Sequence, residues 1–272
     1  MNWRAIRAIV RKDLKVVVQN KGVMIPIIVL PLVFLVLLPG MAALVPLLED
    51  APGTSLSEMA GFIEGMPAGV RESIAGYNEA QTIIIVALVY FLAPMYLILP
   101  LMVASVIAAD SFAGEKERKT LEALLYTPTS DRELLVAKML SSMVPAVAIA
   151  WIGFLLYSIT ANVAAWSTME RIFFPSLMWI VLAIWVAPAV AGLGLGITVL
   201  VSSRAESFQE AYQLGGVVVL PILLLVVGQI TGVLYFSSWM VVVLGLVFWI
   251  VDAVLLTLGA RRFRRSELAA GM

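Results

Sequence analysis

Long stretches without charge are the feature that most restricts what this chain can fold into. Four such stretches contain no Asp, Glu, Lys or Arg: residues 22–48, 80–109, 139–169 and 172–203. Because the hydrocarbon core of a bilayer accepts about 20 apolar residues as one helix, each stretch holds one membrane span. A fifth stretch, 211–251, is too long for one span, and its apolar pattern continues past Asp252 to residue 260. We divide it at residues 235–239, which predicts six spans.

The chain is therefore expected to be a single all-α integral membrane domain covering residues 1–272. Its 62% hydrophobic and 13% charged residues agree with this class, since soluble domains carry about 25% charged residues. The predicted spans are residues 22–48, 80–109, 139–160, 172–201, 211–232 and 239–260. Residues 1–21 precede them as an amphipathic interfacial helix, residues 49–79 form an outer loop, and residues 110–138 form a cytoplasmic loop.

The distribution of basic residues predicts the orientation, because Lys and Arg accumulate in short cytoplasmic segments. With six spans, sixteen of the eighteen Lys and Arg residues fall on the same side as the two termini. Five spans would place the tail with Arg261, Arg262, Arg264 and Arg265 on the outside. The first apolar stretch is longer than the roughly 7–15 residues of a signal peptide core, so we expect it to remain as a span. We predict a multi-pass protein of the cell membrane with both termini in the cytoplasm.

The residue inventory argues against an enzyme, because the chain contains no His and no Cys. Imidazole catalysis, Cys nucleophiles, disulfides and metal sites built from His or Cys are excluded. An intramembrane aspartic protease would need two Asp residues within the membrane, and only Asp252 lies deep in a predicted span. We expect no catalytic residues and no metal site.

Residues 1–21 have the pattern of a basic amphipathic helix. Apolar residues recur at steps of three and four, at Trp3, Ile6, Val10, Leu14 and Val17. A neighbouring stripe carries Arg4, Arg7, Arg11 and Lys15. Two compatible interpretations stay open: anionic lipid holds the helix at the membrane interface, or its polar face also contacts a partner.

The outer loop at residues 49–79 predicts two short helices on the outer membrane surface. One helical face collects Leu56, Met59, Ile63, Met66, Val70, Ile74 and Tyr77. Ser55 and Glu58 have the spacing of a capping box, and Pro67 suits the first turn of the second helix. The acidic residues of this loop either form a solvated face or draw cations towards an exit.

The loop at residues 110–138 is the densest polar sequence in the chain and predicts a helix, a break and a second helix. Glu115 and Lys119 are spaced as an ion pair along the first helix. Pro128 ends that helix, and Ser130 with Glu133 forms a capping box that opens the third span. Such a short, two-signed helix between spans suits the docking of a protein, although a solvated loop has the same composition.

Residues 114–120 look like a phosphate-binding loop, but the second Gly of that motif is absent and no strand precedes it. We therefore expect this chain to bind no nucleotide. If the protein uses ATP, another subunit must supply the nucleotide site.

Two polar residues in the last spans are candidates for a transport path. An acidic residue near the middle of a span, such as Asp252, costs about 2.5–3.5 kcal/mol on insertion scales and needs compensation. Either it forms a structural hydrogen bond to a neighbouring helix or it lies on the path together with Gln229. Gly192, Gly194 and Gly196 in the fourth span are expected to let helices approach closely.

The run SFAGEKERKTLEALLYTP at residues 111–128, followed by RELLVAK, resembles the type-2 ABC export permeases, the ABC-2 family. Supporting marks are RKDLK in the amphipathic N-terminal helix, the Pro-rich first span, and SSRAESFQEAYQLGGVVVLP at residues 202–221. The resemblance covers most of the chain. It implies a six-helix half-transporter that pairs with a second permease copy or a related permease.

The resemblance also implies two cytoplasmic ABC ATPase subunits, which hold ATP and Mg and power export. The residues that would form the coupling segment on the ATPase are Phe112, Gly114, Glu115, Lys116, Glu117, Arg118, Thr120, Leu121, Glu122 and Pro128. No nucleic acid partner is implied, and membrane lipid surrounds the spans. Two alternatives stay open on the residues alone. An ion-coupled secondary transporter would need coupling sites near the midplane, and a non-transporting membrane scaffold would need no ATPase.

Overall fold

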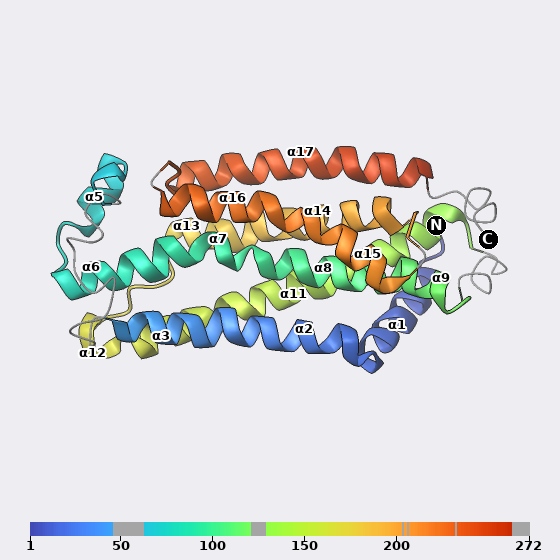
Figure 1. The fold of residues 1–272 in the computed structure, drawn as a ribbon, viewed down its shortest axis with the longest axis horizontal. Coiled ribbons are helices and arrows are strands. Elements are labelled where there is room, and N and C mark those ends of the chain that lie inside the picture. Colours follow the sequence, from blue (N-terminus) through green and yellow to red (C-terminus); the bar gives the residue numbers. More distant parts are fainter. Residues whose placement is uncertain (46–62, 121–128, 203, 206, 232, 263–272) are drawn as a thin grey trace.

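The computed structural model describes residues 1–45, 63–120, 129–202, 204–205, 207–231 and 233–262. Within these ranges the chain forms helices and no strand. Six helical segments are long and apolar enough to cross a membrane: Lys21–Leu44, Glu79–Glu117, Asp131–Ala164, Leu177–Ser202, Phe208–Gln229 and Ser238–Gly259. They run lengthwise beside one another in a single bundle (Figure 1). The prediction of an all-α integral membrane fold with six spans is confirmed.

The first span is built from α2 (Lys21–Leu32), η1 (Val33–Leu37) and α3 (Leu38–Leu44). Pro26 and Pro31 lie inside α2 and each removes one backbone donor. The helix passes into the π-helical turn η1 two residues after Pro31. The irregular helix that the prolines predict is therefore present as a local change in winding.

The second span extends well beyond the residue at which its charge-free stretch ends. It consists of α6 (Glu79–Ile85), η3 (Val86–Phe91), α7 (Leu92–Tyr96), α8 (Ile98–Ala109), η4 (Asp110–Gly114) and α9 (Glu115–Glu117). Residues 110–117 were expected to belong to a separate short helix, and this was wrong: they continue the second span. The buried acidic residues of this segment are neutralised there, Glu115 by Lys12 and Lys138 and Asp110 by Arg118, so the helix continues through them. Residues 121–128, the remainder of the expected helix, lie outside the described residues.

The third span, α11 (Asp131–Ala164), begins as the sequence predicts. The Ser130 hydroxyl accepts a hydrogen bond from the Glu133 backbone N–H, and the Glu133 carboxylate accepts one from the Ser130 backbone N–H. This capping box satisfies two donors at the helix start. The short helix α12 (Trp166–Met169) follows α11 at the opposite end of the bundle (Figure 1).

The last three spans complete the bundle. Their helices are α13 (Leu177–Val181), η5 (Leu182–Val186), α14 (Ala187–Ser202), α15 (Phe208–Gly215), η6 (Gly216–Val218), α16 (Val219–Ile230) and α17 (Ser238–Arg262). The fifth and sixth spans separate between Ile230 and Ser238, a stretch that overlaps the expected division at residues 235–239. In the outer loop, α5 (Ala68–Ile74) follows Pro67, and Met66 and Ile74 are buried. The expected first helix of that loop, with Ser55 and Glu58, lies outside the described residues.

Helices α8 and α14 form the centre of the bundle, with α11 packed on α8 and α17 packed on α14. Glycines make these contacts close. A Cβ atom at Gly194 would lie 2.5 Å from the carbonyl oxygen of Leu101, and one at Gly196 would lie 3.0 Å from Cβ of Leu255. The expectation that small residues of the fourth span permit close approach is therefore confirmed.

Helix α1 (Trp3–Gln19) crosses one end of the bundle and packs on α11 (Figure 1). Its buried face consists of Ile6, Ile9, Asp13 and Val17, whereas Trp3 is 63% exposed. Of the expected apolar stripe, Ile6 and Val17 are buried and Val10 and Leu14 are half-buried, so Trp3 is its one exposed member. The start of α1, the end of α17 and α9 lie at the same end of the bundle. We call it the α9 end.

Candidate functional site

A buried ion pair anchors the segment that the resemblance assigns to coupling. The Glu115 carboxylate lies 2.5 Å from Nζ of Lys138 on α11. Glu115 is 3% exposed and Lys138 is 0% exposed. The Lys138 ammonium also donates to the carbonyl and hydroxyl oxygens of Ser111 and lies 5.2 Å from the centre of the Phe112 ring. Removing one partner would leave a buried charge unpaired, so the pair fixes this segment to α11.

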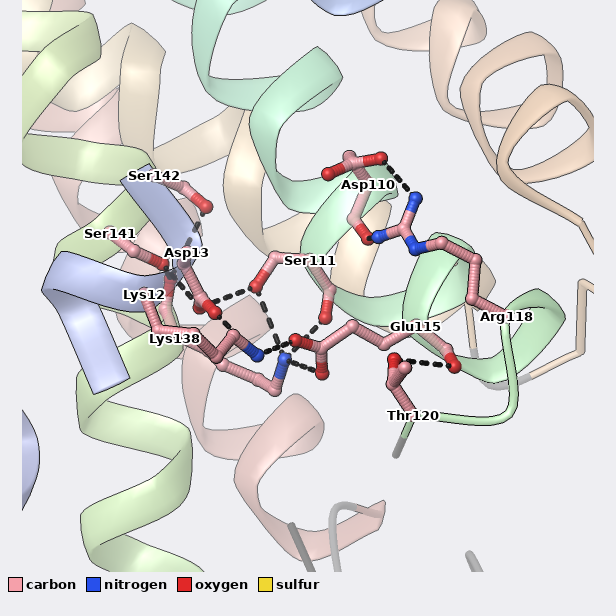
Figure 2. A network of polar contacts seen from close by, with 10 residues as sticks. All are labelled: Lys12, Asp13, Asp110, Ser111, Glu115, Arg118, Thr120, Lys138, Ser141 and Ser142. Carbon is pink, nitrogen blue, oxygen red and sulfur yellow. Dashed lines mark hydrogen bonds and ion pairs between the residues drawn. The ribbon is translucent and has the colours of Figure 1, made fainter. Parts of the chain in front are cut away.

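Lys12 of α1 reaches the same carboxylate from the other side. Its ammonium group pairs with Glu115 and with Asp13, whose Oδ1 lies 2.9 Å away (Figure 2). Burial alone would lower the pKa of Lys12, but the hydrogen bonds and negative charges of Glu115 and Asp13 outweigh it and raise the pKa. Lys12 therefore remains protonated at physiological pH and neutralises the acidic groups around it.

Asp13 joins three helices at one carboxylate. It is 3% exposed, and its Oδ2 accepts hydrogen bonds from Ser111 at 3.0 Å and from Ser141 at 3.1 Å. Asp13 belongs to α1, Ser111 to η4 and Ser141 to α11. The polar network in Figure 2 is therefore a joint that holds α1, the end of the second span and the start of the third span together.

Asp110, the first residue of η4, accepts hydrogen bonds from one residue that precedes it and one that follows it in the sequence. It is 1% exposed, and its Oδ1 accepts hydrogen bonds from the Arg118 guanidinium at 2.9 Å and from the Asn20 side chain at 3.0 Å. Arg118 follows α9, and Asn20 is the residue between α1 and α2. The end of α9 is thereby tied back to the start of the first span.

Two further contacts tie α9 to the fifth span. The Lys116 ammonium donates to the carbonyl oxygen of Ala205 at 3.3 Å, and the Glu117 carboxylate accepts a hydrogen bond from the backbone N–H of Phe208 at 2.9 Å. Phe208 is the first residue of α15, where an acidic group is favourable because the backbone donors of a helix start are unpaired. Movement of α9 would therefore act on α15 as well as on α1 and α11.

The segment ends in a tight cap that exposes its last residues. Lys119 has a φ of 54°, and its backbone N–H donates to the Lys116 carbonyl. The Thr120 backbone N–H donates to the Glu115 carbonyl. These two bonds form a Schellman motif, in which Lys119 occupies the left-handed position that usually carries Gly. The expected helical pairing of Glu115 with Lys119 was wrong, because Lys119 terminates the helix and Glu115 pairs with Lys12 and Lys138.

The expected coupling residues divide into a buried group and an exposed group. Phe112, Gly114 and Glu115 are buried, Lys116 is half-buried, and the exposed residues are Glu117, Arg118, Lys119 and Thr120. We call residues 117–120 the exposed tip. Leu121, Glu122 and Pro128 lie outside the described residues. Among the described residues of this segment, the exposed tip is the part most accessible to another protein, and the buried group fixes the position of that tip.

Gln229 and Asp252, the two candidates for a transport path, lie on different helices and contact different neighbouring helices. Gln229 is 1% exposed and donates to the carbonyl oxygen of Tyr90 at 2.6 Å. Asp252 is 2% exposed, and neither of its carboxylate oxygens has a hydrogen-bond partner in the part of the chain that the structure describes. A Cβ atom at Gly192 would lie 2.3 Å from Oδ2 of Asp252. The structural hydrogen bond considered for Asp252 is therefore not formed within the described residues.

Sequence reasoning did not identify Lys12, Asp13, Asp110 or Lys138 as members of a site. One signal was present in α1. Asp13 lies seven residues after Ile6 and four before Val17, so it shares their helical face and is an acid within an apolar stripe. Lys138 gave no comparable signal, because a basic residue near the end of a span usually extends towards water.

Comparison with known proteins identifies the family. The family described as ABC-2 family transporter protein matches residues 7–241. Among curated proteins, none matches the sequence. The matched range begins within α1, includes the whole polar network, and ends near the start of α17, so that Asp252 lies outside it. With six spans and a match over most of its length, the chain belongs to the ABC-2 transporter family, as a multi-pass membrane subunit of a transporter.

Proposed function

We propose that this protein is the membrane-spanning permease of an ATP-driven exporter, with a separate cytoplasmic ABC ATPase as its energy source. The observation that carries the proposal is the connection between the exposed tip and the bundle. One helical path runs from the central helix α8 through η4 and α9 to residues 117–120. Buried ion pairs fix this path to α1 and α11. A force applied at the tip would therefore reach the second span, the third span and α1.

On this proposal the ATPase holds ATP and Mg, and the permease contributes no catalytic residue. The α9 end faces the cytoplasm of the cell, which agrees with the concentration of Lys and Arg in residues 1–21 and 110–138. The transport path lies between this chain and a second permease copy or a related permease. Asp252 and Gln229 remain the polar candidates along it.

Export is favoured over import by the parts of the chain outside the spans. The outer loop of residues 49–79 is short for a domain that would receive a delivered solute. The mostly uncharged spans suit an amphipathic cargo, and the acidic outer loop would also suit the exit of a cation. The substitution Asp252→Asn distinguishes these two cargo classes.

The test of coupling uses two exposed residues that have the same backbone conformation and lie at opposite ends of the bundle. Lys119 has a φ of 54° and Glu170 has a φ of 51°. Lys119→Glu reverses charge at the exposed tip, and Glu170→Lys reverses charge after α12. We expect Lys119→Glu to reduce co-purification with the ATPase and ATP-driven transport in reconstituted vesicles. Glu170→Lys should leave both unchanged.

Each alternative function makes a different prediction in the same experiment. If the permease never co-purifies with an ATPase and transports in response to an ion gradient alone, it is a secondary transporter. A membrane scaffold would show no transport under either condition. If Lys119→Glu and Glu170→Lys both leave assembly and transport at wild-type levels, residues 117–120 are a solvated turn and the coupling proposal is wrong.

A further inference from the structure

The outward face of α1 carries four basic side chains that have no counter-charge within the part of the chain that the structure describes. Arg4, Arg7, Arg11 and Lys15 are all exposed. Ion pairs of the described residues involve Lys12, Arg118, Lys138 and the N-terminal amine, and none of these four. Lys12, on the same helix, is neutralised by Asp13 and Glu115. The other four charges are therefore open to an anionic partner. We call them the basic stripe.

Two apolar side chains lie at the ends of this stripe. Trp3 is 63% exposed and Val18 is 66% exposed. At about 100° per residue, Trp3, Val18 and the basic stripe fall within one sector of about 120° on the helix surface. Exposed Trp and apolar residues interleaved with Arg and Lys are typical of a helix surface at the boundary between lipid headgroups and acyl chains.

The opposite face of α1 is not free to bind lipid. Ile6 and Ile9 are buried in a cluster with Leu134 and Leu135 of α11, and Val17 is buried in a cluster with Val103 and Ile107 of α8. Protein therefore covers most of the apolar stripe, and any contact with anionic lipid must come from the polar face of α1. What α1 presents outward is the basic stripe.

The connection to the first span places this face beside the membrane surface. Asn20 accepts a hydrogen bond from Gly22 N–H at 3.1 Å and ends α1, and α2 begins at the next residue. Lys15 and Val18 thus lie within two turns of the first residue of a span. Clusters of basic residues next to a span attract acidic lipid headgroups at about 1 kcal/mol for each Lys or Arg.

We propose that the basic stripe binds the headgroups of anionic phospholipids at the cytoplasmic membrane surface. The other side of the same helix holds Glu115 through Lys12 and holds Ser111 through Asp13. Lipid charge would therefore influence the position of the exposed tip. This second step rests on the proposed coupling function, whereas lipid binding does not.

The test measures lipid retention, which requires neither ATP nor an ATPase. The full-length permease is placed in nanodiscs of equal parts phosphatidylcholine and phosphatidylglycerol, and native mass spectrometry counts the lipids that remain bound. Arg7→Gln/Arg11→Gln removes two charges of the stripe. Arg132→Gln/Arg204→Gln removes two charges from exposed residues elsewhere at the α9 end and is the matched control.

We expect the wild-type protein and the control to retain phosphatidylglycerol in preference to phosphatidylcholine. Arg7→Gln/Arg11→Gln should weaken that preference by about fivefold for each removed charge, the change that corresponds to about 1 kcal/mol. Added salt should reduce the preference of the wild-type protein, because exposed charges are screened.

Equal retention of phosphatidylglycerol by the stripe variant and the wild type would overturn the proposal. If the stripe variant keeps its lipid preference but loses co-purification with the ATPase, the stripe is a protein interface. If lipid retention changes as expected but vesicles show no ATP-driven transport under any condition, the lipid site stands and the proposed coupling function fails.

Discussion

Lys138 and Glu115 form an ion pair that is closed off from solvent, with the ammonium nitrogen 2.5 Å from a carboxylate oxygen and the lysine fully buried. The pair joins the start of the third span to the end of the second. Because Lys12 contributes a second positive charge to the same carboxylate, Glu115 is the common partner of two helices. Its removal should affect the fold before it affects any contact with another protein.

Glu115→Gln should therefore destabilise the permease itself. The substitution leaves the buried ammonium of Lys138 without its counter-charge, and breaking such a pair costs about 3–5 kcal/mol. Thermal unfolding in detergent should show a clear decrease in Tm. Lys138→Gln should lower Tm less, because Lys12 still neutralises Glu115. The double variant Glu115→Gln/Lys138→Gln should lose less than the sum of the two. Additive losses would mean that the two side chains do not interact energetically.

Gly192→Ala should be destabilising because of Asp252. The added methyl carbon would lie 2.3 Å from Oδ2 of Asp252, closer than non-bonded atoms approach. Forcing extra volume into a packed interface costs about 1–3 kcal/mol. Shortening the opposing side chain should restore stability, so Gly192→Ala/Asp252→Ala should unfold at a higher temperature than Gly192→Ala alone. A double variant that is no more stable would show that α14 and α17 separate at this point.

The cargo class is tested by Asp252→Asn, which removes charge with little change in volume. If Asp252 lies on a cation path, the substitution should sharply reduce ATP-driven sodium transport in vesicles that contain permease and ATPase. Transport of a fluorescent phosphatidylcholine analogue should change little. Equal effects on both probes, with normal assembly, would remove Asp252 from the transport path and leave it a packing residue.

Sidedness is tested cleanly because the sequence contains no Cys. Lys119 and Glu170 are exposed residues that follow α9 and α12, at opposite ends of the bundle (Figure 1). In intact cells, a membrane-impermeant maleimide should label Glu170→Cys and not Lys119→Cys. After the cells are opened, both should be labelled. Labelling of Lys119→Cys in intact cells would reverse the proposed orientation.

The six spans were predictable because a membrane span requires a long run of uncharged residues, which the sequence displays directly. The start of α11 was also predictable, since Ser130 and Glu133 cap it with their own side chains. The end of the second span was not. Its charge-free run stops at Ala109, but the helix continues to Glu117, where Asp110 is neutralised by Arg118 of the same segment and Glu115 by Lys12 and Lys138 of other helices.

The candidate site, too, was predictable only in part. The resemblance assigned ten residues between Phe112 and Pro128 to one coupling segment, yet it did not distinguish the buried Glu115 from the exposed Glu117. That distinction depends on Lys12 and Lys138, which lie more than twenty residues away in the sequence. Helical periodicity considers one helix at a time and predicts that charged residues face water. It does not show which of them pair with a charged residue on another helix.

The packing of α1 also imposes an order on biogenesis. Ile6 and Ile9 are covered by Leu134 and Leu135, and Asp13 is bound by Ser141, all of which belong to the third span. While the ribosome has produced only the first two spans, α1 lacks the part of its packing surface that α11 provides. Helix α1 therefore reaches its final position only after α11 has been inserted.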